Sequence, residues 1–276
     1  MENVKDLFDL TGRVAVITGG TGLLGQQHAE AIAQAGGIPV MADIRINGVD
    51  SHSREWKERF GGQACAIQTD ITDPESVKKL LASVLAKFGR VDILVNNAAN
   101  NPKMENKADV EFSRLEFFPL EQWDADLNVG LKGAFLCSQV IGSEMARRKQ
   151  GVIVNVASDL AVIAPDQRLY RKPGLTEDKQ PVKPVTYSVV KTGLIGLTRY
   201  LATYWADRGI RVNAISPGGV YNNQPEDFVE RLARLIPLGR MANANEYQAA
   251  ILFLCSDASS YMTGNNLVID GGRSSW

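Results

Sequence analysis

The chain has 276 residues, of which 45% are hydrophobic and 22% are charged, and its formal net charge is -1. This length and composition allow a large buried core, and the balance of charge gives no reason to expect nucleic acid or an anionic membrane surface as a partner. The acidic, amphipathic first residues predict no signal peptide, and the longest apolar runs, residues 151–157 and 249–255, are too short for a membrane span.

Cysteine and histidine are scarce in this sequence. Cys65, Cys137 and Cys255 stand far apart in apolar surroundings, so we expect buried, reduced thiols and a cytoplasmic protein. His28 and His52 are the only histidines, and no cluster of cysteines and histidines has the spacing of metal ligands. We therefore expect no metal site.

Short β-rich runs alternate with helical patterns along the chain. Strands are expected at residues 14–17, 38–42, 64–68, 93–95, 152–156, 212–215 and 267–269. Most of these runs are continuously apolar, which is typical of strands covered on both faces. Helices are expected at residues 26–35, 75–88, 123–145 and 185–207, and Asp73 followed by Pro74 is a good start for the second of them.

This alternation predicts an α/β fold with a single doubly wound parallel sheet of about seven strands and helices on both faces, the Rossmann type. No linker or repeat interrupts it, so we expect one catalytic domain, with a cofactor half over about residues 8–120 and a substrate half over about residues 121–276.

Two segments, residues 100–121 and 159–184, are longer than a simple connection needs. Both follow the carboxyl ends of strands, where open α/β sheets bind ligands. The second contains four prolines, which favours an ordered flap, and its Arg168, Arg171 and Lys172 could meet polar groups of a substrate. We expect it to determine substrate specificity; the alternative is a solvated surface insertion.

A glycine-rich turn follows the first strand, with Gly19, Gly22 and Gly25 three residues apart. Such a turn before a helix lets the pyrophosphate of a dinucleotide approach backbone N–H groups, although a flexible turn would also be rich in glycine. Asp43 ends the second strand, where a carboxylate accepts hydrogen bonds from the adenosine ribose and favours NAD. Arg45 nearby could accept the 2′-phosphate of NADP, which we consider the less fitting cofactor.

Tyr187 and Lys191 are four residues apart in an expected helix and therefore share a face. The ammonium of Lys191, together with the positive charge of a nicotinamide, could lower the pKa of the phenol and make it an acid/base group.

The order of motifs strongly resembles the short-chain dehydrogenase/reductase family over about residues 8–272. The motifs are the stretch 18–25, Asp70 in Thr-Asp-Ile-Thr, Asn96-Asn97-Ala98-Ala99, Asn128 in Asn-Val-Gly, Ser158 after a strand, Tyr187 with Lys191, Pro217-Gly218 and Asp270-Gly271-Gly272. Each motif alone is weak, whereas the ordered set is specific.

The resemblance implies roles for individual residues. Tyr187 would be the general acid/base, Ser158 would orient the reacting oxygen, Lys191 would lower the pKa of the tyrosine and hold the nicotinamide ribose, and Asn128 would position a water. Asp70 would face the adenine, Asn97 would support the sheet, and the stretch from Pro217 to Val220 would face the carboxamide. The residues implied for cofactor binding are Gly19, Thr21, Gly22, Leu23, Leu24, Gly25, Asp43, Asp70, Ile71, Asn97, Ala98, Tyr187, Lys191, Pro217, Gly218 and Val220.

Three features depart from the family pattern. Ala99 replaces a glycine, Asn222 stands where a threonine often follows the Pro-Gly pair, and Ser158 and Tyr187 are 29 positions apart, which is unusually long. Ser188 is a weaker rival for the role of Ser158.

We therefore expect an NAD(P)-dependent oxidoreductase that moves a hydride between a nicotinamide and a secondary alcohol or ketone, such as a sugar, a polyol or a sugar derivative. One alternative is a 3-oxoacyl-thioester reductase, and one of another class is a non-catalytic, nucleotide-binding regulatory protein. Apolar residues around the helices at 123–145 and 185–207, among them Phe135, Leu136, Leu194, Leu197, Leu201, Tyr204 and Trp205, predict a homotetramer.

Overall fold

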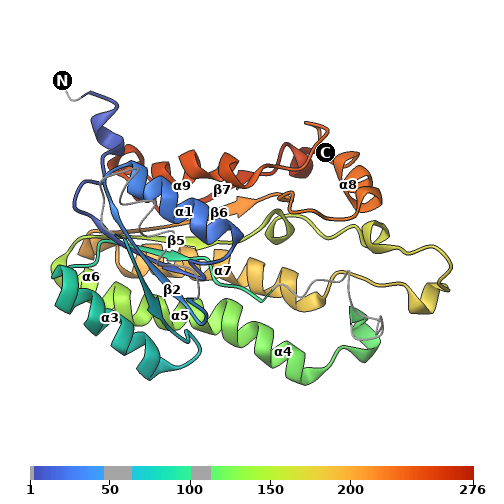
Figure 1. Ribbon diagram of the computed structural model, residues 1–276, viewed down its shortest axis with the longest axis horizontal. Coiled ribbons are helices and arrows are strands. Elements are labelled where there is room, and N and C mark those ends of the chain that lie inside the picture. The colour runs from blue at the N-terminus through green and yellow to red at the C-terminus, as the bar shows by residue number, and fades with distance from the viewer. Residues whose placement is uncertain (1–2, 47–63, 101–112) are drawn as a thin grey trace.

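One parallel sheet organises the computed structural model, which describes residues 3–46, 64–100 and 113–276 (Figure 1). The strand order is β3-β2-β1-β4-β5-β6-β7. The strands are β1 (Val14–Thr18), β2 (Ile38–Asp43), β3 (Cys65–Gln68), β4 (Ile93–Asn96), β5 (Gly151–Val156), β6 (Ile210–Pro217) and β7 (Asn266–Ile269). All neighbouring pairs are parallel, which confirms the predicted Rossmann-type sheet.

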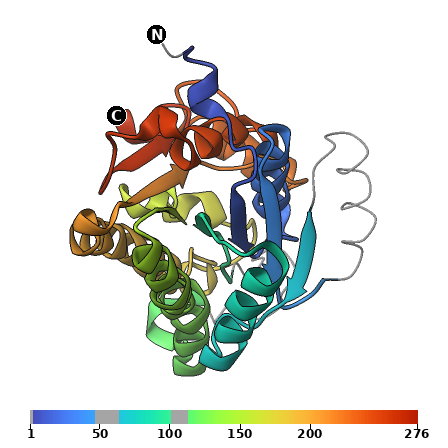
Figure 2. The ribbon, with the colours of Figure 1, turned by 90° about the vertical axis from the view of Figure 1, so that its left-hand side faces the viewer.

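Helices cover both faces of this sheet (Figures 1 and 2). Helices α1 (Leu23–Gln34) and α9 (Gln248–Cys255) pack on one face, where Ile32 and Leu254 join Ile17 and Val154 of the strands in one buried cluster. The other face holds α3 (Pro74–Phe88), α4 (Leu120–Leu127), α5 (Gly133–Cys137), α6 (Ser143–Arg148) and α7 (Val185–Tyr204). The core therefore lies in two apolar layers, one on each side of the sheet.

The helix boundaries differ from the predicted ones at several ends. The Asp73 side chain caps α3 as expected, accepting hydrogen bonds from the N–H groups of Glu75 and Ser76. Helix α1 begins three residues earlier than predicted, because Gly22 of the glycine-rich turn is itself the N-cap. The last long helix ends at Tyr204, and a 3₁₀ turn at Ala206–Arg208 follows.

The predicted helix at residues 123–145 is a longer run that contains two π-helical turns. These turns, Asn128–Lys132 and Ser138–Gly142, separate α4, α5 and α6. π-turns inside helices are rare and often lie near functional sites, and hydrophobic periodicity does not reveal them.

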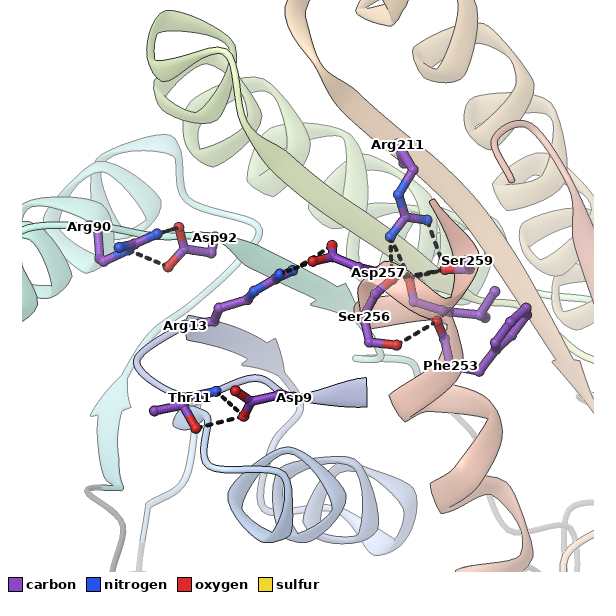
Figure 3. A network of polar contacts seen from close by, with 11 residues as sticks. Asp9, Thr11, Arg13, Arg90, Asp92, Arg211, Phe253, Ser256, Asp257 and Ser259 are labelled. Atoms are coloured by element: carbon purple, nitrogen blue, oxygen red, sulfur yellow. Dashed lines mark hydrogen bonds and ion pairs between the residues drawn. The ribbon is translucent and has the colours of Figure 1, made fainter. Parts of the chain in front are cut away.

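Polar contacts tie the amino ends of the strands together (Figure 3). The guanidinium of Arg13 pairs with Asp257, and that of Arg211 donates to the Ser256 carbonyl at 2.8 Å and to Ser259 Oγ at 2.9 Å. The Asp92 carboxylate accepts from the Val14 N–H at 2.9 Å. The amino ends are opposite the carboxyl ends of the strands, so the network stabilises the sheet away from the expected site.

The cysteines and histidines fit the sequence expectation only in part. Cys137 and Cys255 are buried, but Cys65 is half-buried on β3, because that strand is at the edge of the sheet; all three are free thiols. His52 lies outside the described residues, and within those residues no group of three or more metal-binding side chains comes together. In the same part of the chain, no helix has the length and apolar character needed to cross a membrane.

Candidate active site

Close packing explains the glycines after β1. Gly19 has a positive φ of 61°, and a Cβ there would lie 2.8 Å from the Ala98 Cα. A Cβ at Gly25 would lie 2.2 Å from the Gly19 carbonyl oxygen. Gly22 caps α1 without a side-chain hydrogen bond, which leaves N–H groups of the first helical turn available to an anion. The loop therefore has the form that a pyrophosphate requires.

The next strand end supports this loop. The Asn97 side-chain amide donates to the carbonyls of Thr18 and Gly19, both at 3.0 Å. The Thr18 hydroxyl in turn accepts from the backbone N–H groups of Asn97 and Ala98 at 3.0 and 3.1 Å. The carboxyl ends of β1 and β4 are thus fixed to each other where the strand order changes direction, the usual ligand position in such sheets.

A cleft of about 850 Å³ lies at this end of the sheet. Its walls include Ser158, Tyr187, Lys191 and every residue implied for cofactor binding except Gly25, which packs beneath the loop. Ala99 and Asn222, two of the departures from the family pattern, also line it.

Asp43 lies at one end of this cleft. Its carboxylate accepts hydrogen bonds from the hydroxyl and the backbone N–H of Thr21, at 2.7 and 3.2 Å, and from the N–H of Arg45 at 3.2 Å. The half-buried carboxylate therefore holds the glycine-rich loop, while the exposed Arg45 lines the same region.

Tyr187 and Lys191 come from the first turns of α7 and meet Ser158 from the end of β5. Burial raises the pKa of Tyr187, and a hydrogen bond with Ser158 opposes that shift. Lys191 is 5% exposed, its Nζ donates to the Val156 carbonyl at 2.8 Å, and burial followed by repulsion from Lys183 lowers its pKa to about 8.

Burial is the largest influence on the pKa of Tyr187, and the lowering expected from Lys191 together with a bound nicotinamide stays a prediction. The Lys191 Nζ is 5.9 Å from the centre of the Tyr187 ring and is directed to a carbonyl, so the loss of water around the phenol dominates.

A buried ion pair lies directly behind Ser158. One oxygen of the Asp159 carboxylate accepts from the Ser158 hydroxyl and from the Leu160 N–H, both at 2.8 Å. The other oxygen accepts from the Arg273 guanidinium at 2.7 Å, and both side chains of the pair are less than one tenth exposed. Sequence reasoning identified neither residue. Asp159 could have been suspected from its place next to Ser158, but Arg273 is 114 positions away.

Residues of the insertion at 159–184 form part of one wall of the cleft. Its short helical turn Gln167–Tyr170 lies beside α8 (Glu226–Ala233) (Figure 1). Leu169 of this turn is buried in the same apolar cluster as Leu232. The part of the cleft lined by residues 169–172, Lys183, Arg231 and Arg273 is called the substrate end below.

The structure revises two sequence expectations about this region, those for Arg168 and Asn128, and agrees with the weaker standing of Ser188. Arg168 is 79% exposed, pairs with Asp166 and does not line the cleft, whereas Arg171 and Lys172 do. Ser188 is also absent from the cleft wall. Asn128 begins the first π-turn, and its exposed side chain does not reach the cleft, so the structure does not bring it to Lys191.

The sequence matches known families over nearly all its length. Residues 13–170 match the family described as short chain dehydrogenase, and residues 177–274 match the one described as Enoyl-(Acyl carrier protein) reductase.

Individual relatives cover the chain from end to end. An NAD-dependent glycerol dehydrogenase of Listeria innocua is 34% identical over 270 residues, which is 96% of this chain and 95% of the relative. A 3-oxoacyl-[acyl-carrier-protein] reductase of Thermotoga maritima is 35% identical over 268 residues, 95% of this chain and 98% of the relative. The crystal structure of a gluconate 5-dehydrogenase from Burkholderia cenocepacia in complex with NADP and tartrate is similar with a TM-score of 0.85 and 27% identity, covering 99% and 100% of the two chains.

Proposed function

The chain belongs to the short-chain dehydrogenase/reductase family, and from this membership we propose that it oxidises a polar secondary alcohol or reduces the matching ketone with a nicotinamide cofactor. The observation that carries the proposal is the meeting of Ser158, Tyr187 and Lys191 in the cleft that the glycine-rich loop also lines. The relatives named for glycerol and gluconate support a polyol, a sugar or a sugar derivative.

In this proposal the cofactor supplies or accepts the hydride, and residues of the chain transfer one proton. The Tyr187 hydroxyl exchanges that proton with the reacting oxygen, and the Ser158 hydroxyl orients the same oxygen. Lys191 binds the ribose and favours the phenolate, in a site where burial alone would keep the phenol protonated. For Asn128 we propose a role through the π-turn that it begins rather than through its side chain.

We propose NAD as the preferred cofactor, because a carboxylate rather than a cation ends β2 at Asp43. The relatives include NAD and NADP enzymes, so this preference depends on Asp43 itself. We also propose one catalytic domain, a cytoplasmic location, for which the three free thiols are the support, and a homotetramer.

Reduction of 3-oxoacyl thioesters is the second candidate, favoured by the Thermotoga relative, a 3-oxoacyl-[acyl-carrier-protein] reductase. The charged side chains at the substrate end favour a polar substrate instead. A non-catalytic nucleotide-binding protein is the third candidate, and turnover of any alcohol would exclude it.

The proposal is tested by following NADH and NADPH formation at alkaline pH with polyols, sugars, sugar acids and 3-hydroxyacyl thioesters. Tyr187→Phe should lower kcat by roughly 10²- to 10⁴-fold while cofactor binding is retained, because only the hydroxyl enters the chemistry. Lys191→Met should lose rate and also bind cofactor more weakly. Tyr221→Phe, a change at an exposed tyrosine outside the cleft, is the matched control. Turnover of Tyr187→Phe within a few-fold of the parent would show that the mechanism is wrong.

A further inference from the structure

The substrate end of the cleft is strongly cationic. Among the described residues, six basic side chains line it or border it: Arg171, Lys172, Lys183, Lys191, Arg231 and Arg273. Three of the arginines have carboxylate partners. Arg273 pairs with Asp159 at 2.7 Å, Arg231 with Asp227 at 3.0 Å and Arg171 with Glu177 at 2.7 Å, and of these carboxylates Asp159 and Asp227 line the cleft. The whole chain has a net charge of -1, so this excess of positive charge is local to the cleft.

Lys183 lies over the ring of Tyr187, the proposed acid/base group. Its Nζ lies 3.7 Å from the centre of the Tyr187 ring, closer than the Nζ of Lys191. Its backbone N–H donates to Gln167 Oε1 at 2.8 Å, and Pro184 follows it at the start of α7, so its position is fixed by the insertion and the helix together.

The surroundings of Lys183 favour an anion. Burial lowers its pKa to about 8, and Lys183 and Lys191 repel each other across the tyrosine. Desolvation and repulsion between cations both diminish when a negative group enters between them. Asp159 offsets part of this charge, but its carboxylate is already bonded by Arg273 and Ser158.

Arg231 offers a second donor from the opposite wall, on α8. Its terminal nitrogen pairs with Asp227 at 3.0 Å, yet its Nε is buried and has no hydrogen-bond partner among the described residues. Buried donors in proteins are nearly always paired, so a water or a ligand atom at this wall would complete the bonding of Arg231.

We propose that the substrate end binds an oxyanion of the substrate, a carboxylate or a phosphate, with Lys183 as the main contact and Arg231 as the second. The substrate class would then be polyol acids or polyol phosphates rather than neutral polyols. This inference rests on the proposed function. The glycine-rich loop and the N-terminus of α1 already provide a place for the pyrophosphate of the cofactor, whereas these two cations line the substrate end.

The test compares xylitol, xylonate and xylitol 5-phosphate, and also glucitol, gluconate and glucitol 6-phosphate, with NAD and with NADP. The parent should have a kcat/KM roughly ten-fold or more higher on an anionic member of a series than on the neutral one. Lys183→Met should reduce that ratio by roughly 10- to 100-fold, and the ratio cancels any effect of the variant that the neutral and the anionic substrate share. Lys179→Met, at an exposed lysine of the same insertion that does not line the cleft, should leave the ratio unchanged.

A binding measurement that needs no turnover accompanies the kinetics. Inorganic phosphate and tartrate are titrated into the protein–NADH complex, followed by NADH fluorescence, so that the cofactor fills its own phosphate site. We expect saturable binding that Lys183→Met weakens at least roughly ten-fold and Lys179→Met does not.

The outcomes separate the two proposals. Equal loss on neutral and anionic substrates in Lys183→Met, or a raised KM for NAD alone, would overturn the oxyanion site and leave the proposed function intact. If no member of either series is turned over with either cofactor, the proposed function fails for these substrates, and the phosphate and tartrate titrations still decide the oxyanion site. If Lys183→Met binds phosphate and tartrate as tightly as the parent does, the oxyanion site is also overturned.

Discussion

The carboxylate of Asp43 and the guanidinium of Arg45 line one end of the cleft with opposite charges. Asp43 is half-buried and bonded to Thr21, whereas Arg45 is exposed and contacts Asp43 only through its backbone N–H. A held carboxylate repels a phosphate dianion at short range, while an exposed side chain must first be ordered to attract one. The charges of Asp43 and Arg45 together therefore favour NAD, the cofactor without a 2′-phosphate.

This balance predicts the effect of removing one charge. Asp43→Asn keeps an acceptor oxygen for Thr21 but loses the repulsion, so the ratio of kcat/KM with NADP to that with NAD should rise by roughly 10- to 100-fold. Arg45→Gln is the companion variant and should leave the NAD reaction nearly unchanged. A parent enzyme that already prefers NADP would contradict the assignment and would make Arg45 the deciding residue.

His28 of α1 is a second residue with a clear electrostatic consequence. It is completely buried, neither ring nitrogen has a partner among the described residues, and burial lowers its pKa to about 3. In the unfolded chain the pKa of histidine is about 6.5. Above that pH the imidazole is neutral in both states and has no effect on stability. Below it only the unfolded state binds the proton, so the free energy of unfolding decreases as the pH falls.

We predict that His28→Leu makes the protein less sensitive to acid. Between pH 8 and pH 5 the parent should lose about 2 kcal/mol more of its free energy of unfolding than the variant, because only the parent must keep a buried imidazole neutral. Urea denaturation of both proteins at the two pH values measures this difference. A stability difference between them that is the same at pH 8 and pH 5 would show that His28 does not titrate on unfolding.

At the scale of elements, the strands were predictable and the breaks in the helices were not. Mostly apolar runs identified the strands to within a few residues. A strand that is covered on both faces has apolar side chains at successive positions, which makes it recognisable in the sequence. The π-turn at Asn128–Lys132 leaves no such signal, since its residues remain helical in composition. Thus the sequence located Asn128 in a helix but not the direction of its side chain.

The same limit applies to the candidate site. Tyr187 and Lys191 were predictable because they share a helix face and belong to the ordered set of motifs that resembles the family, whereas the pair alone is weak evidence. The glycines were predictable because each marks a close approach. The Asp159–Arg273 pair joins β5 to the C-terminal segment through the fold alone, so no local pattern could reveal it. Burial likewise decides the pKa of Tyr187, and burial depends on the whole cleft.

The insertion between β5 and α7 leads to an element-scale prediction. Leu169 is 4% exposed and joins Leu232 and Ile236 in the small apolar cluster beneath α8. Leu169→Ala should loosen this anchor at a local cost of about 2–5 kcal/mol and raise the KM for substrate roughly ten-fold, with the KM for NAD nearly unchanged. Leu175→Ala, at a more exposed leucine of the same insertion, is the control.

Steady-state kinetics with each substrate varied in turn measures this effect. Circular dichroism and the affinity for NAD establish that the variants are folded. Unchanged kinetics in Leu169→Ala on the best substrate would mean that the insertion has no part in recognition, although it lines the cleft.

At the scale of the whole molecule, the amino ends and the carboxyl ends of the strands have different roles. The amino ends of the strands are joined by Arg13, Asp92 and Arg211 in a network distant from the cleft (Figure 3). The carboxyl ends carry the glycine-rich loop, Ser158 and the insertion. Substitutions at the amino ends of the strands should therefore alter stability with little effect on substrate choice. Substitutions at the carboxyl ends should alter substrate choice more than stability.

The surface of α7 bears on the oligomeric state. Of the apolar residues from which association is predicted, Leu136, Leu194, Leu201 and Trp205 are buried within the chain itself. Exposed apolar surface remains at Phe135, which is 45% exposed, and at Tyr204, which is 60% exposed and stacks on Tyr200 with ring centres 5.6 Å apart. A stacked aromatic pair on an open helix face is typical of an interface.

We predict a homotetramer in solution, with the Tyr200–Tyr204 face of α7 in one of its interfaces. Light scattering at micromolar concentration should give about four times the mass of the chain. The double variant Tyr200→Glu with Tyr204→Glu should give a smaller species, because association would bury two carboxylates without partners. Tyr261→Glu changes a tyrosine that is fully exposed on another element and should leave the mass unaltered. A parent protein that is monomeric at these concentrations would refute the prediction, and an unaltered mass in the double variant would place the interface on a different face.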